Sequence, residues 1–175
     1  MAVDMLVSRQ DRGPFLYSET RISCGRPFGL LKFRTVRRDV LEEVRRAQSH
    51  VRPYEADPAN LTWTGRRLLK PWYLDELPQL LNVLRGDISL VGPRPWPPEM
   101  VERQVAAGRD YRNHVIAGLT GPAQVTKGER VPYEDLDLRY VERCGMLGSW
   151  ALVLYDLEIL RQTVAVVARG EGLSY

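Results

Sequence analysis

The sequence predicts a compact, mainly helical α+β domain with a small N-terminal β-hairpin, and three observations support that fold class. Two β-prone runs, Phe15–Ile22 and Phe28–Val36, are separated by the turn-rich stretch Ser-Cys-Gly-Arg-Pro. Much of the chain that follows carries apolar residues at helical spacing. A length of 175 residues is enough for one domain with its own core. We therefore expect a single domain over 1–175, with 1–12 as a short flexible segment.

Two short helices are expected after the hairpin. The segment Arg38–Ser49 is rich in arginine and carries a narrow apolar stripe of Val40, Leu41 and Val44. A second helix is expected over 61–69, after a loop that begins with an Asp-Pro pair. The first helix has the pattern of a surface helix with one buried edge.

The central stretch, residues 70–96, reads KPWYLDELPQLLNVLRGDISLVGPRPW. Its apolar positions are Leu74, Leu77, Leu81, Leu84 and Ile88, and its polar ones are Asp75, Gln79, Asn82 and Gly86. The spacing predicts an amphipathic helix with a polar working side. Proline is tolerated only in the first turn of a helix, so Pro78 places Asp75 and Glu76 at or just before the helix N-terminus.

Two interpretations of Asp75 stay open at this point. Aspartate is a favoured N-cap residue, so an acidic pair before an apolar helix needs no chemistry. A helix N-terminus also favours anions, because its N–H groups are free and its peptide dipoles are aligned. In that position a carboxylate stays ionised and a phosphate can lie beside it.

The segment after this helix favours the chemical interpretation. Arg94 lies between Pro93 and Pro95. Each proline restricts the backbone around it, so the guanidinium is presented from a stiff loop at low entropic cost. The alternative is a polyproline connector that continues through Pro97 and Pro98.

The C-terminal half predicts two further helices and a glycine-rich loop. Proline-first and glycine-last signals predict a helix from Pro97 to near Gly108. The basic segment Arg109–His114 follows and is expected to face phosphate, with His114 at the surface. Gly118–Val125 is expected to be a tight loop whose backbone can approach a ligand closely. The stretch Trp150–Ala168 is apolar but interrupted by charges, so it predicts an amphipathic helix that does not span a membrane.

The amino-acid composition limits the kinds of binding partner that are expected. The formal net charge is +3, and most of the basic residues are arginines, whose planar guanidinium suits phosphate groups. No helix-turn-helix, zinc or RNA-binding signature accompanies the charge, so we expect no nucleic-acid partner. Cys24 and Cys144 are the two cysteines, which is typical of reduced thiols in the cytoplasm.

Four motifs in order resemble the bacterial sugar transferases, the monotopic polyprenyl-phosphate phosphoglycosyl transferases. Leu74–Pro95 is similar to the core signature of that family. Lys32–Thr35 resembles its K-x-R-T segment, Gly118–Val125 its G-I-T-G-x-A-Q-V loop, and Leu136–Val141 its D-x-x-Y-V entry to the C-terminal helices. The resemblance spans roughly residues 13–166, and four ordered motifs are far less common by chance than one.

The resemblance implies transfer of a sugar-1-phosphate from a UDP-sugar to polyprenyl phosphate, with release of UMP and with Mg²⁺, at the start of exopolysaccharide or lipopolysaccharide assembly. A carboxylate can act as nucleophile in such a displacement and form an acyl phosphate, and this role is assigned to Asp75. Glu76 is expected to help Asp75 hold Mg²⁺ or to accept a proton, and Arg94 to bind a phosphate. The other candidates for phosphate or nucleotide binding are Lys32, Arg34, Lys70 and Gln124.

The chain departs from the family pattern at several positions. The family commonly has arginine where Lys70 stands and a small residue where Tyr73 stands. Lysine keeps the charge but lacks the bidentate geometry of arginine. Members also usually begin with a re-entrant membrane helix, and no run here approaches the roughly 20 apolar residues of a membrane span.

Peripheral binding to an anionic membrane surface is therefore the expectation, at the cytoplasmic face of the bacterial inner membrane. Arginines, together with Trp63, Trp72 and Trp96, are suited to that interface, unless the arginines are merely solvated and the tryptophans belong to the core. Two other classes stay open: a non-catalytic scaffold of the same fold, and a soluble Mg²⁺-dependent phosphohydrolase in which water replaces the lipid phosphate. The sugar itself is not identified by the sequence.

Overall fold

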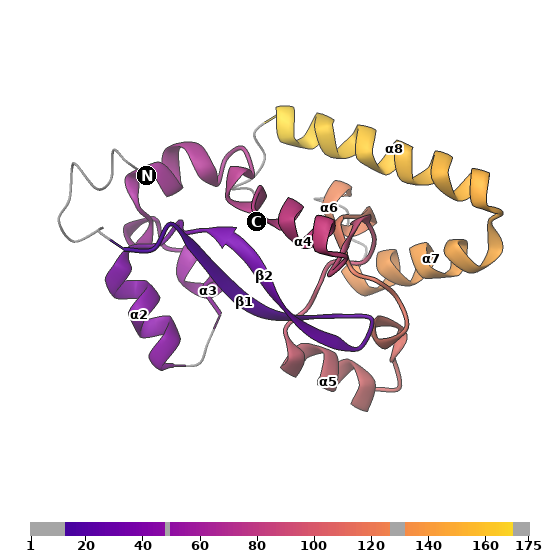
Figure 1. Cartoon of the computed structure of the whole chain (residues 1–175), viewed down its shortest axis with the longest axis horizontal. Helices are drawn as coiled ribbons and strands as arrows, with labels where there is room; N and C mark the ends of the chain where they lie inside the picture. The colour runs from indigo at the N-terminus through magenta and orange to yellow at the C-terminus, as the bar shows by residue number, and fades with distance from the viewer. Residues whose placement is uncertain (1–12, 48–49, 127–131, 170–175) are drawn as a thin grey trace. The chain divides into compact units, whose positions relative to one another are not determined.

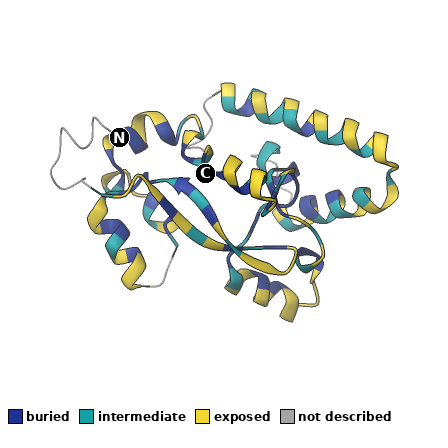
Figure 2. Cartoon of the chain, viewed as in Figure 1, coloured by how far each residue is buried: buried dark blue, intermediate teal, exposed yellow. Residues whose placement is uncertain are grey.

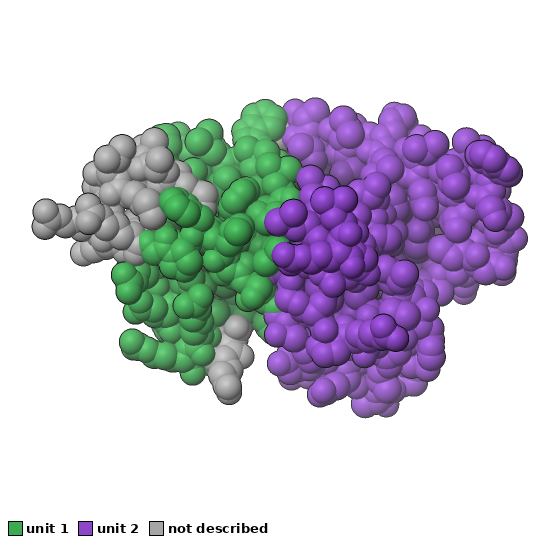
Figure 3. All heavy atoms as spheres, viewed as in Figure 1, with its two compact units in different colours: residues 1–19, 31–78, 170–175 green, residues 20–30, 79–169 purple. Residues whose placement is uncertain are grey.

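The computed structural model of this chain describes residues 13–47, 50–126 and 132–169, so the segment 1–12 lies outside the described part. The chain divides into two compact units, which Figure 3 colours separately. Unit 1 comprises 1–19, 31–78 and 170–175, and unit 2 comprises 20–30 and 79–169. Helices predominate and an antiparallel hairpin stands at the N-terminal side, which confirms the predicted α+β class (Figure 1).

The hairpin consists of β1, Leu16–Ser23, and β2, Arg26–Phe33. Cys24 and Gly25 connect the strands, and both have positive φ, at 49° and 70°. A two-residue connection with positive φ at both positions matches the twist of antiparallel strands, which is why glycine is useful there. The predicted hairpin is confirmed.

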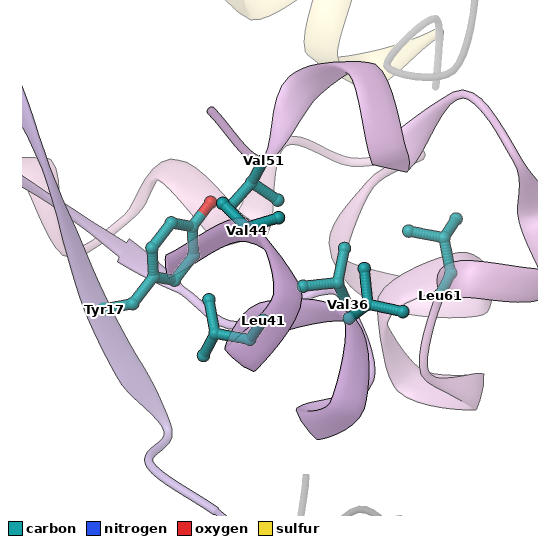
Figure 4. Close-up of a cluster of buried hydrophobic side chains, with 7 residues drawn as sticks. Tyr17, Val36, Leu41, Val44, Val51 and Leu61 are labelled. Atoms are coloured by element: carbon teal, nitrogen blue, oxygen red, sulfur yellow. The ribbon is translucent and has the colours of Figure 1, made fainter. Parts of the chain in front are cut away.

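Unit 1 has one apolar core. Helix α2, Arg38–Arg46, buries Val40, Leu41 and Val44 as its sequence predicts, while α3, Arg52–Glu55, follows. The buried residues of this core are Tyr17, Val36, Val40, Leu41, Val44, Val51 and Leu61 (Figure 4). The predicted helix extended to Ser49, and Gln48 and Ser49 lie outside the described residues. Packing of α2 on this core fixes the strand and turn segments around it.

The rest of unit 1 consists of short helical turns. They are η2 at Pro58–Asn60, the π-helix η3 at Gly65–Leu69, and η4 at Leu74–Glu76. A side chain at Gly65 would collide with the carbonyl oxygen of Thr35. Thr62 donates to that same oxygen from its N–H, at 2.8 Å, and from its Oγ1, at 3.1 Å. The predicted helix over 61–69 is therefore a π-turn anchored to the segment after β2.

Unit 2 contains the remaining elements. They are α4 (Gln79–Arg85), β3 (Ser89–Val91), α5 (Pro98–Ala106), η5 (Tyr111–Asn113), β4 (Gly118–Thr120), α6 (Pro122–Val125), α7 (Tyr133–Met146) and α8 (Ser149–Ala168). The strands β3 and β4 are parallel, with Ser89 opposite Gly118 and Val91 opposite Thr120. Helix α5 begins at a proline, and Gly108 follows it with φ 78°, as its predicted start and stop signals require.

The predicted tight loop at Gly118–Val125 is wrong, because this stretch forms β4 and α6. Its glycines are needed for contact between backbones. A side chain at Gly118 would collide with the backbone nitrogen of Gly92, and one at Gly121 would collide with the carbonyl oxygen of Gly92. Small residues here let two backbone segments of unit 2 touch directly.

The polar face of α4 is buried, which contradicts the expected polar working side. Gln79 and Asn82 are buried, and Asn82 donates from Nδ2 to the Gly29 carbonyl at 2.9 Å and to Asp87 Oδ2 at 2.8 Å. The exposed side chains include Leu81 and Leu84, the latter 83% exposed (Figure 2). The Asn82 amide thus has hydrogen-bond partners within the protein, and the polar face of α4 is the internal one.

Helix α8 covers the predicted stretch, but the prediction that it is amphipathic is wrong, because apolar side chains lie on its exposed face as well as on its buried one. Ile159 and Val166 are buried, while Trp150, Leu154 and Val164 are mostly exposed (Figure 2). Of the helices that the structure describes, none is both long enough and apolar enough to cross a membrane.

Candidate active site

Asp75 lies in the turn η4, inside unit 1, and is only 2% exposed. Tyr73 immediately precedes this turn with φ 54°, a left-handed conformation that costs a residue with a side chain roughly 1–2 kcal/mol. The turn therefore begins with a strained residue, at a position where glycine would avoid the cost because it has no Cβ atom. Helix α4 begins at Gln79, so Asp75 precedes that helix and is not its N-cap residue.

The carboxylate of Asp75 belongs to a buried chain of charged groups. Asp75 Oδ2 lies 3.1 Å from Lys70 Nζ, and the same ammonium lies 2.6 Å from Glu55 Oε2. Thr35 Oγ1 donates to Glu55 Oε1 at 2.6 Å. All four residues are buried, so these contacts form in a medium where charge interactions are strong.

Burial raises the pKa of Asp75 above its usual range, and the Lys70 ammonium opposes that rise. The negative charges of Glu76 and Glu55 raise this pKa further, whereas the Lys32 ammonium lowers it. The cations around Asp75 thus favour its carboxylate form against the cost of burial. That form is the one that can act as a nucleophile.

Glu76 and Asp75 carry the carboxyl groups that the sequence proposes for Mg²⁺. Glu76 is partly exposed, and carboxylate oxygens are the ligands that Mg²⁺ prefers. No group of three or more metal-ligating side chains occurs among residues 13–47, 50–126 and 132–169. Mg²⁺ commonly binds through one or two carboxylates, with water and substrate phosphates completing its shell, so the donor set fits.

Lys32 and Arg34 both lie in unit 1 but differ in what they contact. Lys32 is buried, and its Nζ lies 4.0 Å from Glu19 Oε2. The guanidinium of Arg34 donates to the carbonyl oxygens of Pro14 and Val36, each at 3.1 Å. Lys32 therefore adds positive charge near Asp75, whereas Arg34 binds backbone carbonyls of its own unit.

Arg94 and Gln124 lie in unit 2, whereas Lys32, Lys70, Asp75 and Glu76 lie in unit 1. The side chain of Arg94 is partly exposed, and its carbonyl oxygen accepts from Arg112. Both amide atoms of Gln124 are buried and have no hydrogen-bond partner among the described residues. A buried amide that has no partner is costly, so polar groups of this kind need hydrogen-bond partners.

Arg112 fixes the loop that carries Arg94. Its Nε donates to Gln104 Oε1 at 3.0 Å, and its other nitrogens donate to the Arg94 carbonyl and to Asp137 Oδ2. Its guanidinium also lies 4.0 Å from the centre of the Trp96 ring. The basic segment around Arg112 was expected to face phosphate, but this guanidinium is buried and binds protein groups.

Sequence reasoning did not predict the buried ion pairs of three residues, namely Glu55 in unit 1 and Arg112 and Asp137 in unit 2. Arg112 is in a segment noted for its basic character, and Asp137 belongs to the D-x-x-Y-V motif, so both had a signal. Glu55 had no signal in the sequence, because a single acidic residue before a loop does not indicate an ion pair with Lys70.

Comparison with known proteins identifies relatives that match most of the chain. The uncharacterised sugar transferase EpsL of Bacillus subtilis is 40% identical over 156 residues, 85% of this chain and 67% of its own length. The UDP-glucose:undecaprenyl-phosphate glucose-1-phosphate transferase of Caulobacter vibrioides is 37% identical over 167 residues, 91% of this chain and 59% of its own. The undecaprenyl-phosphate glucose phosphotransferase of Komagataeibacter xylinus is 34% identical over 176 residues, 93% of this chain and 31% of its own.

The chain thus spans between about one third and two thirds of the length of these three relatives. The family model described as bacterial sugar transferase matches residues 1–170, which include every motif quoted above. The resemblance inferred from those motifs is confirmed, and the chain belongs to the bacterial sugar transferase family.

Proposed function

We propose that this chain transfers a sugar-1-phosphate from a UDP-sugar to polyprenyl phosphate and releases UMP, as the first step of glycan assembly. The observation that carries the proposal is the buried Asp75 carboxylate with a lysine ammonium 3.1 Å away. Support also comes from relatives whose names specify undecaprenyl-phosphate transfer of glucose or glucose-1-phosphate. A nucleophile, charge neutralisation and positioning are the requirements of phosphoryl transfer.

The reaction proceeds by two displacements at one phosphorus. An oxygen of Asp75 bonds to the phosphorus that carries the sugar, and the bond from that phosphorus to the bridging oxygen breaks, so UMP leaves with the electron pair. An oxygen of polyprenyl phosphate then bonds to the same phosphorus, and Asp75 leaves as a carboxylate. Lys70 neutralises charge as it develops, Lys32 adds to that field, and Arg94 binds a phosphate group.

Asp75 and Glu76 would hold Mg²⁺, which when bound neutralises the charge of the diphosphate. The Glu76 carboxylate, which is partly exposed, would also accept the proton of an incoming lipid phosphate. Gln124, whose side-chain amide is buried, is a further candidate for phosphate or nucleotide binding.

The test is release of UMP from purified protein given UDP-sugars and Mg²⁺, with and without polyprenyl phosphate. UMP turnover that needs the lipid supports the transferase. Turnover without lipid would instead indicate a phosphohydrolase, and no UMP from any UDP-sugar would favour a scaffold. A screen over several UDP-sugars also identifies the sugar, and mass spectrometry of Asp75 after UDP-sugar alone detects the covalent intermediate.

We further propose that unit 1 docks peripherally on an anionic membrane surface. Trp63 is 52% exposed, Trp72 is 45% exposed and Leu77 is 49% exposed, with the exposed Arg66 and Arg67 in the same unit. Tryptophan prefers the membrane interface, and each basic residue near an anionic leaflet contributes about 1 kcal/mol. The lipid acceptor is itself in the bilayer, so such docking places the enzyme at the cytoplasmic face, next to its substrate.

Flotation with vesicles that contain anionic lipid tests this docking. We expect binding at low salt that weakens at high salt, because electrostatic attraction is screened. The double variant Trp63→Ser, Trp72→Ser should bind less at every salt concentration, whereas Trp150→Ser in unit 2 serves as the matched control. Equal binding of the two variants, or no binding of the wild type at low salt, would contradict the role of unit 1.

A further inference from the structure

We propose that Glu55 is a positioning residue that holds the Lys70 ammonium at the Asp75 carboxylate throughout the reaction, an inference that rests on the function proposed above. Glu55 ends α3, is 7% exposed, and has its Oε2 2.6 Å from Lys70 Nζ. Asp75 Oδ2 lies farther from the same nitrogen, at 3.1 Å. Of these two carboxylates, the one that does not react is therefore the nearer to the lysine.

The arrangement matters because the charge of Asp75 changes during the first displacement. When an oxygen of Asp75 bonds to phosphorus, the carboxylate becomes an acyl phosphate and loses its own negative charge. A lysine held by Asp75 alone would lose that attraction just as charge accumulates on the phosphoryl oxygens. Glu55 keeps its charge, so Lys70 stays in place and turns from the carboxylate oxygen to the phosphoryl oxygens.

Glu55 is itself held rigidly enough to act as an anchor. Thr35 Oγ1 donates to its second oxygen, Oε1, at 2.6 Å, and Thr35 is fully buried. The Thr35 carbonyl accepts in turn from the N–H of Thr62, and Gly65 leaves no side chain to disturb this approach. The two oxygens of Glu55 thus have different partners, which fixes the plane of the carboxylate.

The residue type at position 70 fits this role. A lysine ammonium is a compact charge with three donors that rotate, so it can be shared between two carboxylates and redirected to a third anion. Holding such a flexible side chain in one place costs conformational entropy, and a buried partner offsets that cost. Glu55 supplies this partner.

A double-mutant cycle in the transferase assay tests the proposal. Glu55→Gln keeps the shape and removes the charge, so we expect kcat to fall by about tenfold while KM for the UDP-sugar changes by less than about twofold. In a Lys70→Met background, Glu55→Gln should have no further effect, because it acts through Lys70. Glu42→Gln, which removes an exposed carboxylate paired with Arg38, is the matched control and should leave kcat unchanged.

Labelling of lysine amines in the folded protein tests the contact without any activity. The sequence has three lysines, at 32, 70 and 127, so each can be followed by mass spectrometry of its own peptide. Glu55→Gln should increase the labelling of Lys70 relative to Lys32 by several-fold. Glu55→Asp, which keeps the charge but shortens the reach, should give intermediate labelling and serves if the first variant does not fold.

The outcomes are distinguishable. Unchanged Lys70 labelling, unchanged kcat in Glu55→Gln, or an equal loss of kcat with and without Lys70 would each overturn the role of Glu55. A wild-type protein that releases no UMP from any UDP-sugar would instead reject the transferase, while the labelling still decides whether Glu55 holds Lys70.

Discussion

Two buried ion-paired clusters of this protein differ in how many carboxylates surround the cation. In unit 1, one lysine lies between two carboxylates, those of Glu55 and Asp75. In unit 2, one arginine contacts a single carboxylate, that of Asp137, and also binds a carbonyl oxygen and an amide oxygen. The first cluster shares one cation between two anions, whereas the second ties one cation to several segments of the chain.

The difference indicates what each cluster is for. The lysine can exchange one oxygen partner for another without breaking a planar fork, so the cluster in unit 1 tolerates a change of charge at Asp75. The arginine cannot move without losing several directional hydrogen bonds at once, so the cluster in unit 2 holds the Arg94 loop still. The proposed reaction needs the first property, and presentation of Arg94 as the proposed phosphate-binding residue needs the second.

The largest effect is expected from Asp75→Asn. The amide is nearly the same shape but cannot act as a nucleophile, so kcat should fall by more than about 10³-fold. The UMP-release assay measures this loss, and circular dichroism should show an unchanged fold. Near-normal turnover would mean that the carboxylate in unit 1 is as structural as the one in unit 2.

The second largest effect is expected on stability, from Arg112→Met. Removing the guanidinium leaves the Asp137 carboxylate buried without its cation, which typically costs about 3–5 kcal/mol of unfolding free energy. Urea unfolding measures the change. Arg161→Met is the control, because its ion pair with Glu158 is exposed and should contribute little. Equal stability changes in the two variants would show that burial does not set the value of these pairs.

A pH dependence of stability should follow from Asp137. Burial raises the pKa of this carboxyl from 3.8 to about 6, although Arg112 opposes the rise. The folded protein therefore binds the proton more tightly than the unfolded chain does. Its contribution to stability is full below pH 4 and is lost as the pH rises through 6.

The Asp137→Asn variant isolates that contribution, because asparagine does not titrate. The unfolding free energy of the wild type minus that of the variant should decrease by about 2 kcal/mol between pH 4 and pH 7. Urea titrations of both proteins across this range provide the difference. A difference that stays constant with pH would show that Asp137 is ionised throughout.

The smallest effect is expected from Arg94→Lys, which changes the side chain and leaves the Arg112 bond to the backbone of the loop intact. An ammonium cannot bind a phosphate bidentately, so kcat/KM for the UDP-sugar should fall by about tenfold. Thermal unfolding should be unchanged. Unaltered kinetics would limit the proline loop to a structural role.

The sequence predicted best what depends on local signals. The hairpin, the apolar stripe of α2 and the start of α5 at Pro98 each follow from neighbours a few positions away. The placement of Asp75 just before α4 was also predictable, because Pro78 limits where that helix begins.

Features that depend on residues distant along the chain could not be predicted from the sequence. The spacing of apolar residues in α4 defines two faces but does not indicate which face is internal. In the structure the internal face is the polar one, where Asn82 donates to the Gly29 carbonyl. Glu55 likewise gains its role only from Thr35 and Lys70, which are far from it along the chain. Hydrophobic pattern alone would have assigned the leucines to the core.

The direct backbone contact between Gly92 and Gly118 has a consequence for how the chain folds. The parallel pairing of β3 and β4 must close a long connection that includes α5, and no side chain at either glycine can hold a partial pairing in place. We therefore expect this pairing to form late, after the local helices. Pulsed hydrogen exchange during refolding would show the Gly92 amide, bonded to the Thr120 carbonyl at 2.9 Å, protected after the amides of α7. Simultaneous protection would reject this order.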